Sequence, residues 1–159
     1  MTNVFPNLPV FENVRLAVQS QMGIRYKMRK IVTKYQDVLD KSWDILRLVL
    51  LEEQAFQFAK NLSHGDQRKL ENVCILALEP ELLLLDEPTA GMSVEEVPII
   101  LEVIEKIKEE QDKTILLIEH KMDLILHLSY SVTVLYNGEF LAEGTPEEIM
   151  ANETFRRPI

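Results

Sequence analysis

The feature that most constrains the fold is a run of four leucines that ends in two acidic residues. Leu82 to Leu85 are apolar at every position, and Asp86, Glu87 and Pro88 follow directly. A short, continuous apolar run is typical of a strand in a parallel sheet that is buried on both faces. The run therefore predicts an α/β protein, in which ligands bind beyond the carboxyl ends of the strands.

A small polar loop precedes this strand and opens a helix predicted over Ser63–Glu79. Ser63 and Asp66 have the spacing of an N-terminal capping box. The backbone N–H groups around His64–Asp66, together with the positive end of the helix dipole, would favour a phosphate. A simple cap explains these residues equally well by themselves, and the acidic strand that follows favours the functional interpretation. The apolar face of this helix is Leu70, Val73, Cys74, Ala77 and Leu78.

A second apolar strand is predicted over Thr114–Ile118, and it delivers Glu119 and His120 to the same sheet edge as Asp86 and Glu87. A lone histidine is usually structural, but its place at the end of this strand favours a functional role. The helix between the two strands follows a second Ser-x-x-Glu pattern at Ser93. Because proline disrupts a helix interior, this helix either begins near Val97 or kinks at Pro98.

The remaining elements are predicted from periodicity and turn signals. Helices are expected over Leu8–Gln19, Gln21–Leu39 and Asp40–Glu53, which together form an all-α insert. Toward the C-terminus we expect a helix over Met122–Ser129, then a hairpin of Val132–Tyr136 and Glu139–Ala142 joined by Asn137-Gly138, and a short helix with Pro146 at its first position.

Composition excludes several classes of protein. The 17 basic and 26 acidic residues give a net charge of −9, which disfavours nonspecific nucleic-acid binding, since phosphate contacts need clustered Lys and Arg. The lone cysteine, Cys74, lies on an apolar helix face and is expected to be a small buried hydrophobe. No apolar run reaches the roughly 18 residues needed to span a membrane.

Four ordered motifs resemble the ATP-binding subunit of ABC transporters over nearly the whole chain, from Val4 to about Arg156. LSHGDQ at Leu62–Gln67 resembles the signature loop, LLLLDE the Walker B strand, and EPTAGMS at Glu87–Ser93 the D-loop. His120, which closes LLIEH, resembles the switch histidine. The spelling LSHGDQR with EPTAGM is most similar to subunits that energise uptake of branched-chain amino acids, and of related urea or amide substrates.

The resemblance implies roles for these residues in binding and hydrolysing ATP with Mg²⁺. Asp86 would hold the metal ion, Glu87 would polarise the attacking water, and His120 would contact the γ-phosphate. The signature loop would contact the ATP of a second subunit through Ser63, Gly65 and Gln67, with His64 and Asp66 in the same nucleotide-binding loop. Ser93 stands where many family members have Asp.

The resemblance also implies a partial P-loop NTPase sheet with a helical subdomain. Residues 1–62 would be the segment after the Q-loop and the helical subdomain, and residues 63–159 the signature, Walker B, D-loop and switch part of the core. The implied partners are transmembrane permease subunits, a second ATPase subunit and, indirectly, a periplasmic or extracellular substrate-binding protein, with no nucleic acid. The implied location is cytoplasmic, peripheral on the inner face of the plasma membrane.

Two features of the family do not occur in this sequence. No GxxxxGK[ST] phosphate-binding loop is present, and the Q-loop glutamine is also missing. We therefore expect this chain alone neither to bind ATP tightly nor to hydrolyse it. The resemblance also implies that the strand of the phosphate-binding loop, which would lie between the His120 strand and the strand ending at Tyr136, is missing. Two alternatives to an importer ATPase remain at this point: a noncatalytic docking or regulatory piece, and the ATPase of another system such as lipid export.

Overall fold

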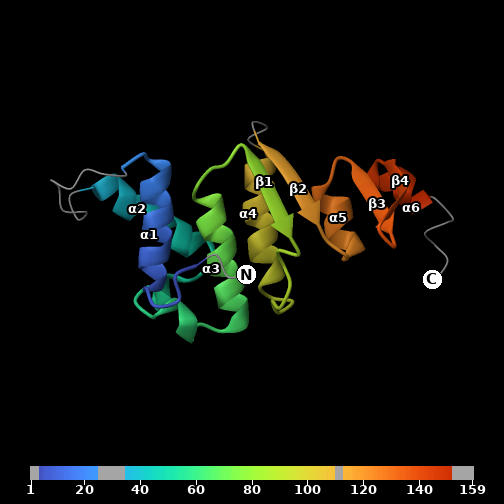
Figure 1. Cartoon of the computed structure of the whole chain (residues 1–159). Coiled ribbons are helices and arrows are strands. Elements are labelled where there is room, and N and C mark those ends of the chain that lie inside the picture. Colours follow the sequence, from blue (N-terminus) through green and yellow to red (C-terminus); the bar gives the residue numbers. More distant parts are fainter. Residues whose placement is uncertain (1–3, 25–34, 110–112, 152–159) are drawn as a thin grey trace. The chain divides into compact units, whose positions relative to one another are not determined.

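The computed structural model describes residues 4–24, 35–109 and 113–151. The chain forms two compact units, the first over Met1–Leu84 and Pro88–Leu116 and the second over Leu85–Glu87 and Leu117–Ile159. Figure 1 shows the order of helices and strands along the chain. The mixture of helices and strands confirms the predicted α/β class.

Helices form the N-terminal part of the first unit. Helix α1 (Val10–Gln21) packs against α2 (Gln36–Leu48) and against α3 (His64–Leu76). Two short 3-10 turns, η2 (Glu52–Gln54) and η3 (Ala59–Asn61), connect α2 to α3. Val10, Val14 and Val18 of α1 are fully buried and form part of the core, because a spacing of four keeps side chains on one helix face.

Helix α2 corrects one prediction from the sequence. The expected break between Leu39 and Asp40 is wrong, because α2 runs without interruption from Gln36 to Leu48. Its buried face is Val38, Ser42 and Leu46, and the Ser42 hydroxyl donates a hydrogen bond of 2.6 Å to the Val38 carbonyl. A serine whose hydroxyl is hydrogen-bonded within its own helix can occupy a buried face. The polar Ser42 therefore concealed the helical spacing of the apolar residues in the sequence. Residues 25–34 of the expected second helix lie outside the described residues.

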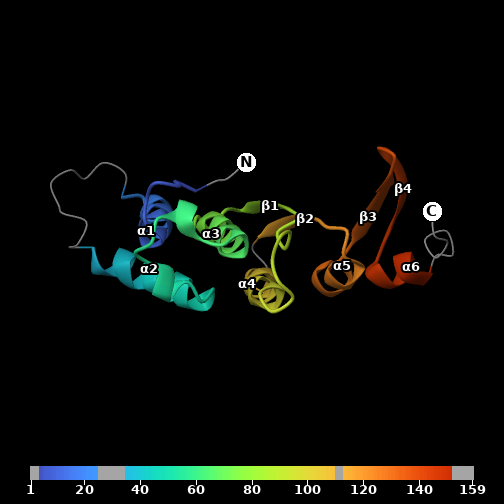
Figure 2. The same ribbon diagram turned by 90° about the horizontal axis from the view of Figure 1, so that it is seen from below.

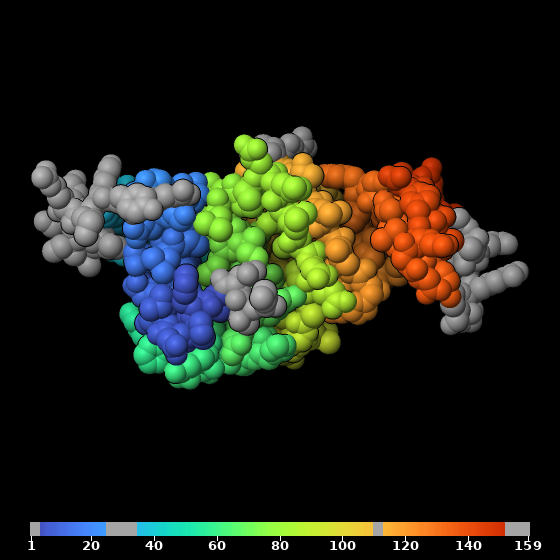
Figure 3. Space-filling model, in the orientation of Figure 1, coloured from blue at the N-terminus to red at the C-terminus, as the bar shows by residue number. Residues whose placement is uncertain are grey.

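The segment before α1 is tied to the segment before α3. The Val10 N–H donates to the Gln57 carbonyl at 2.9 Å, and the Ala59 N–H donates to the Leu8 carbonyl at 3.0 Å. These two segments also adjoin on the surface in Figure 3, where the blue atoms meet the teal ones. The leading segment of the chain is therefore anchored by backbone hydrogen bonds.

Strands β1 (Leu82–Asp86) and β2 (Thr114–Ile118) form a two-stranded sheet. The Thr114 N–H donates to the Glu81 carbonyl and the Glu87 N–H to the Ile118 carbonyl, both at 2.9 Å, so the strands run parallel. Helix α4 (Val97–Glu109) is the crossover between them and lies on one face of the pair (Figures 1 and 2). The second alternative for Pro98 is thus excluded, because the helix begins at Val97 and the proline lies in its first turn.

The expected burial of β1 on both faces is wrong for the described residues. Leu83 is 1% exposed, whereas its neighbour Leu84 is 62% exposed. The exposure of Leu116 and Ile118 on β2 shows the same open face. The physical reason is that successive side chains of a strand point to opposite faces, and only one face of this pair is covered.

The second unit contains the C-terminal elements. Helix α5 (Met122–Leu128) precedes strands β3 (Val132–Tyr136) and β4 (Glu139–Gly144), which pair in antiparallel fashion. The predicted Asn137-Gly138 turn is confirmed, since both residues have positive φ (50° and 82°), as a type I′ turn requires. Helix α6 (Pro146–Ala151) packs on β4 and begins with the expected proline.

Candidate functional site

The signature loop, Leu62–Gln67, is held by a side-chain cap. The Asp66 N–H donates to the Ser63 hydroxyl oxygen at 3.1 Å, and this hydroxyl in turn donates to the Asp66 carboxylate at 2.8 Å. Helix α3 begins at His64, so the predicted cap at Ser63 is confirmed. The cap also corrects one expectation, because the Asp66 N–H is already bonded and is not open to a phosphate.

The other residues of the loop have distinct surroundings. The Gln67 side-chain amide donates to the Leu62 carbonyl at 3.1 Å, which ties the first turn of α3 back to the residue before the cap. Gly65 is buried, whereas His64 is exposed at the start of the helix. The predicted apolar face of α3 is confirmed except at its end, since Leu78 lies beyond the helix and is exposed.

The signature loop contacts the part of the D-loop that belongs to the same unit, Pro88–Ser93. Gly91 has a φ of +75°, and a side chain at this position would overlap the His64 imidazole. Only glycine suits both the backbone angle and the close approach. The His64 side chain therefore lies against a D-loop glycine within the same chain.

Asn72 is a site residue that reasoning from the sequence missed. It is buried on α3, and its side-chain amide donates to the Pro88 carbonyl at 2.9 Å, at the start of the D-loop. A buried amide normally has such a partner, because an unsatisfied polar group in a core is costly. The available signal was a polar residue between the apolar positions Leu70 and Val73 of this helix.

Glu96 lies between the D-loop and the start of α4. Its carboxylate accepts a hydrogen bond of 2.9 Å from the Ser93 N–H, as the predicted Ser-x-x-Glu pattern requires. The hydrogen bond from the Ser93 backbone and, to a smaller extent, the Ser93 side chain and the Lys69 ammonium hold the pKa of Glu96 below its ordinary value of 4.5, although partial burial opposes the shift. The structure thus favours the ionised carboxylate.

In the second unit, Glu87 and His120 come together at the carboxyl ends of β1 and β2. The His120 Nδ1 lies 3.3 Å from a carboxylate oxygen of Glu87. Glu87 also has a φ of +46°, a left-handed conformation that is strained for a residue with a side chain. The Glu87 N–H is bonded to the Ile118 carbonyl, which fixes this conformation directly after the strand. Both side chains are substantially exposed, so water can reach them.

Glu119 is a second residue that the sequence placed at this edge without assigning it a role. Its side chain is 1% exposed, and its carboxylate lies 3.9 Å from the His120 Nδ1. The same carboxylate accepts a hydrogen bond of 3.1 Å from the His120 N–H. This hydrogen bond from the His120 N–H to the buried Glu119 carboxylate fixes the peptide unit between the two residues, and so helps to orient His120.

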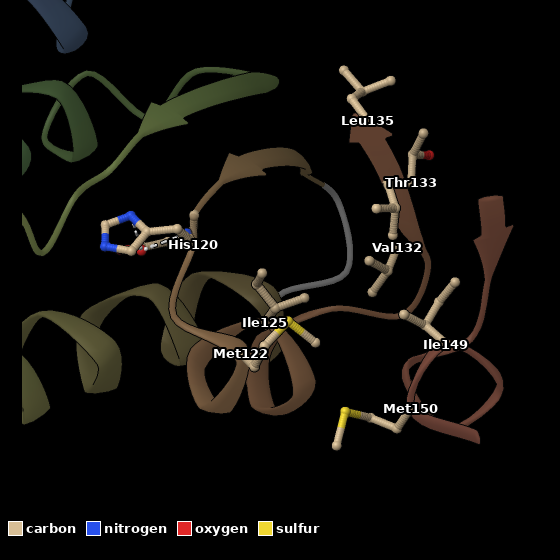
Figure 4. Close-up of a pocket in the computed structure, with 10 residues that line it drawn as sticks. His120, Met122, Ile125, Val132, Thr133, Leu135, Ile149 and Met150 are labelled. Carbon is tan, nitrogen blue, oxygen red and sulfur yellow. Dashed lines mark hydrogen bonds and ion pairs between the residues drawn. The ribbon is translucent and has the colours of Figure 1, made fainter. Parts of the chain in front are cut away.

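A pocket of about 500 Å³ lies beside His120 in the second unit. Figure 4 shows that Met122 and Ile125 of α5, Val132 of β3 and Ile149 of α6 point toward it. Its lining is mostly apolar, whereas a phosphate group needs N–H donors or cations. The chemistry of this pocket therefore does not match a nucleotide phosphate, although His120 lies on its rim.

The cap on α3 gives a direct prediction. We expect Ser63→Ala to lower the free energy of unfolding by about 0.5–2 kcal/mol, because the Asp66 N–H loses its acceptor. Chemical denaturation of the purified chain measures this loss. Ser63→Thr is the matched control, since it keeps the hydroxyl and should stay close to the parent. An unchanged midpoint in Ser63→Ala would contradict a stabilising cap.

The ionised state of Glu96 gives a prediction for pH. A carboxyl whose folded pKa is lowered stabilises the fold above its unfolded pKa, and this contribution is lost as the pH falls from about 4.5 through the folded value. The charged groups that face it are Lys69 and, beyond the lysine, Asp66. Denaturation between pH 7 and 3 should therefore show a shallower loss of stability below pH 4.5 in Glu96→Gln. Parallel curves for the two proteins would disprove the contribution.

The geometry of the two units agrees with comparisons against known proteins. Strands β1 and β2 carry acidic residues at their carboxyl ends, and a capped loop opens helix α3 in an α/β fold. The family model described as ABC transporter matches residues 1–90, more than half of the chain. The chain therefore belongs to the ABC transporter family.

Individual relatives agree with this assignment. The chain is 36% identical over 154 residues to the high-affinity branched-chain amino acid transport ATP-binding protein LivG of Salmonella typhimurium, covering 94% of this chain and 60% of LivG. It is 40% identical, with the same coverage, to BraF of Pseudomonas aeruginosa, which carries the same description. The chain thus spans about 60% of the length of these relatives.

A solved structure supports the fold. The chain superimposes with a TM-score of 0.74 on a dimeric ATP-binding cassette in a post-hydrolysis state bound to ADP and Pi, at 23% identity, covering 91% of this chain and 60% of that one. No helix in the described ranges has the length and apolar character needed to cross a bilayer.

Proposed function

We propose that this chain is the signature, Walker B and switch part of an ATP-hydrolysing subunit that energises an importer of branched-chain amino acids. The observation that carries the proposal is the pairing of Glu87 with His120 at 3.3 Å, at the carboxyl ends of two parallel strands. The printed functions of LivG and BraF support the substrate class. The motifs in the sequence and the geometry of the second unit both support these two residues.

Glu87 and His120 can perform complementary steps in phosphoryl transfer to water. A carboxylate within reach of a water molecule polarises it as a general base. The nearby imidazole orients the carboxylate and the phosphate, and Glu119 holds the His120 backbone in place. Phosphoryl transfer depends mostly on positioning and electrostatic stabilisation, so these groups need no covalent chemistry.

Asp86 is the residue that we assign to Mg²⁺. It ends β1, is exposed at the sheet edge, and is an oxygen ligand of the kind this ion prefers. Mg²⁺ is commonly bound through one or two carboxylates, with water and phosphate completing its shell, so a single Asp86 can serve as its protein ligand. When bound, Mg²⁺ would neutralise phosphate charge.

The remaining assignments complete the proposal. Ser63, His64, Gly65, Asp66 and Gln67 form the loop that would face the ATP of a second ATPase subunit. Transmembrane permease subunits and, indirectly, a substrate-binding protein are the further partners, with the subunit peripheral on the inner face of the plasma membrane. The division at residues 62 and 63 into a helical part and a core part stays a prediction.

A chimaera tests the function. The N-terminal part of LivG that this chain does not align with is joined to the chain, and ATP hydrolysis and uptake of labelled leucine are measured in cells that lack LivG. We expect both activities from the chimaera. For the chain alone we expect no hydrolysis and an ATP dissociation constant weaker than about 1 mM.

The outcomes of this test separate the alternatives. Hydrolysis without leucine uptake would reject the substrate class and favour another transport system, such as lipid export. Tight binding of the isolated chain to permease subunits without nucleotide, and no hydrolysis by the chimaera, would favour a docking or regulatory piece. Intact LivG, expressed in the same cells, is the positive control.

A further inference from the structure

A buried lysine lies between the two loops of the first unit that carry family motifs. The Lys69 side chain on α3 is only 6% exposed. Its ammonium lies 2.6 Å from a carboxylate oxygen of Asp66 and 3.3 Å from one of Glu96. A lysine is almost never buried without partners, because its charge loses hydration, and here two carboxylates from different segments compensate for that loss.

Each of the two carboxylates makes a further contact, one with the signature loop and the other with the D-loop. Asp66 is bonded to the Ser63 hydroxyl at the signature loop, and Glu96 accepts from the Ser93 N–H at the end of the D-loop. We call this series of five residues the polar chain: Ser63, Asp66, Lys69, Glu96 and Ser93. The polar chain links the signature loop to the D-loop. From Ser63 to Glu96 every contact is between side chains, and the last contact is from the Ser93 backbone N–H to the Glu96 carboxylate.

Steric contacts reinforce the polar chain. A Cβ atom at Gly65 would lie 2.5 Å from a carboxylate oxygen of Glu96, so the glycine gives Glu96 the room to reach Lys69. The contact of His64 with Gly91 lies alongside it. The first turns of α3 therefore hold the D-loop at both its middle and its end.

We propose that Lys69 is a positioning residue that joins the signature loop to the D-loop, so that the two loops keep one fixed relative arrangement. The inference deepens the proposed function and rests on it for its effect on ATP hydrolysis. Lys69 does not itself contact the reacting groups in this proposal. It acts through Asp66 and Glu96, and Ser93 takes its place in the D-loop through the Glu96 carboxylate.

The first arm of the test needs no ATP hydrolysis. The Ser93 amide signal is followed by NMR in the full chain as the pH is lowered, because its N–H donates to the Glu96 carboxylate and reports its protonation. In Lys69→Met we expect the midpoint to move to higher pH, and in Lys69→Arg we expect it to stay near the parent. Lys106→Met is the matched control, since Lys106 pairs with Glu102 in an exposed position on α4 and should leave Ser93 unchanged.

The second arm measures hydrolysis by the chimaera. We expect Lys69→Met to lower kcat about 10- to 100-fold with little change in KM, because misplaced loops slow the reaction without removing a substrate contact. Lys69→Arg should restore most of the rate. Should Lys69→Met fail to fold, Glu96→Gln serves instead, since it weakens the same link at its more exposed end and leaves Asp66 with Lys69.

The two arms separate the failure of this inference from that of the proposed function. An unshifted Ser93 midpoint in Lys69→Met would overturn the link between the loops, whatever the chimaera does. A shifted midpoint with an unchanged kcat would overturn the positioning role while the ATPase assignment stands. If the unmodified chimaera hydrolyses no ATP, the proposed function fails, and the titration alone decides whether Lys69 joins the loops.

Discussion

Glu87→Gln in the chimaera is expected to lower kcat for ATP hydrolysis by about 10²–10⁴-fold, the usual contribution of a general base. Glutamine keeps the size of the side chain but cannot accept a proton from water. The 3.3 Å contact between Glu87 and His120 places the carboxylate beside the only histidine at this strand edge among the described residues. Because the change removes chemistry and no nucleotide contact, KM for ATP should remain near the parent value.

Glu81→Gln is the matched control for this experiment. Glu81 is exposed and lies directly before the same strand, at the end opposite Glu87, and its backbone carbonyl accepts a hydrogen bond from the Thr114 N–H. We expect parental activity from this variant in a steady-state assay of phosphate release. Activity of Glu87→Gln within about threefold of the parent would be far smaller than a lost general base allows, and would remove Glu87 from the proposed mechanism.

Leu83→Ala is expected to cost the chain about 2–5 kcal/mol of unfolding free energy, the typical cost for truncating a fully buried leucine. The side chain is 1% exposed on the covered face of β1. Alanine leaves a cavity that the surrounding residues fill only in part. Urea denaturation of the purified chain measures the difference, with a lower midpoint and an unchanged slope as the expected result.

Leu84→Ala is the matched control, because it makes the same change at the next residue of the same strand. Leu84 is 62% exposed, so little apolar surface returns to water when it is shortened. We expect a loss below about 0.5 kcal/mol, as for other surface changes. Equal losses in the two variants would show that both faces of β1 are covered in solution, in conflict with the structure.

The sequence by itself determined the elements whose signals are local. The cap at Ser63 and the turn at Asn137-Gly138 each depend on side-chain and backbone chemistry within a few residues. At Pro98 the sequence left two alternatives, a helix start near Val97 or a kink, and the structure decided for the start at Val97. The apolar runs of β1 and β2 were equally clear in the sequence. They placed Asp86, Glu87 and Glu119 at the carboxyl ends of these strands. Four motifs in order were enough to identify the family.

The tertiary structure alone decided what covers each face and which distant residues meet. An apolar run predicts burial on two faces, but coverage depends on other segments, and β1 is covered on one face only. The break expected within α2 was wrong because Ser42 bonds inside its own helix. The contacts of Asn72 with Pro88 and of Lys69 with Glu96 join residues 16 and 27 positions apart, and no local pattern encodes such pairs. Which buried polar groups form hydrogen bonds or ion pairs depends on how close they lie in the folded chain, and the sequence alone does not give these distances.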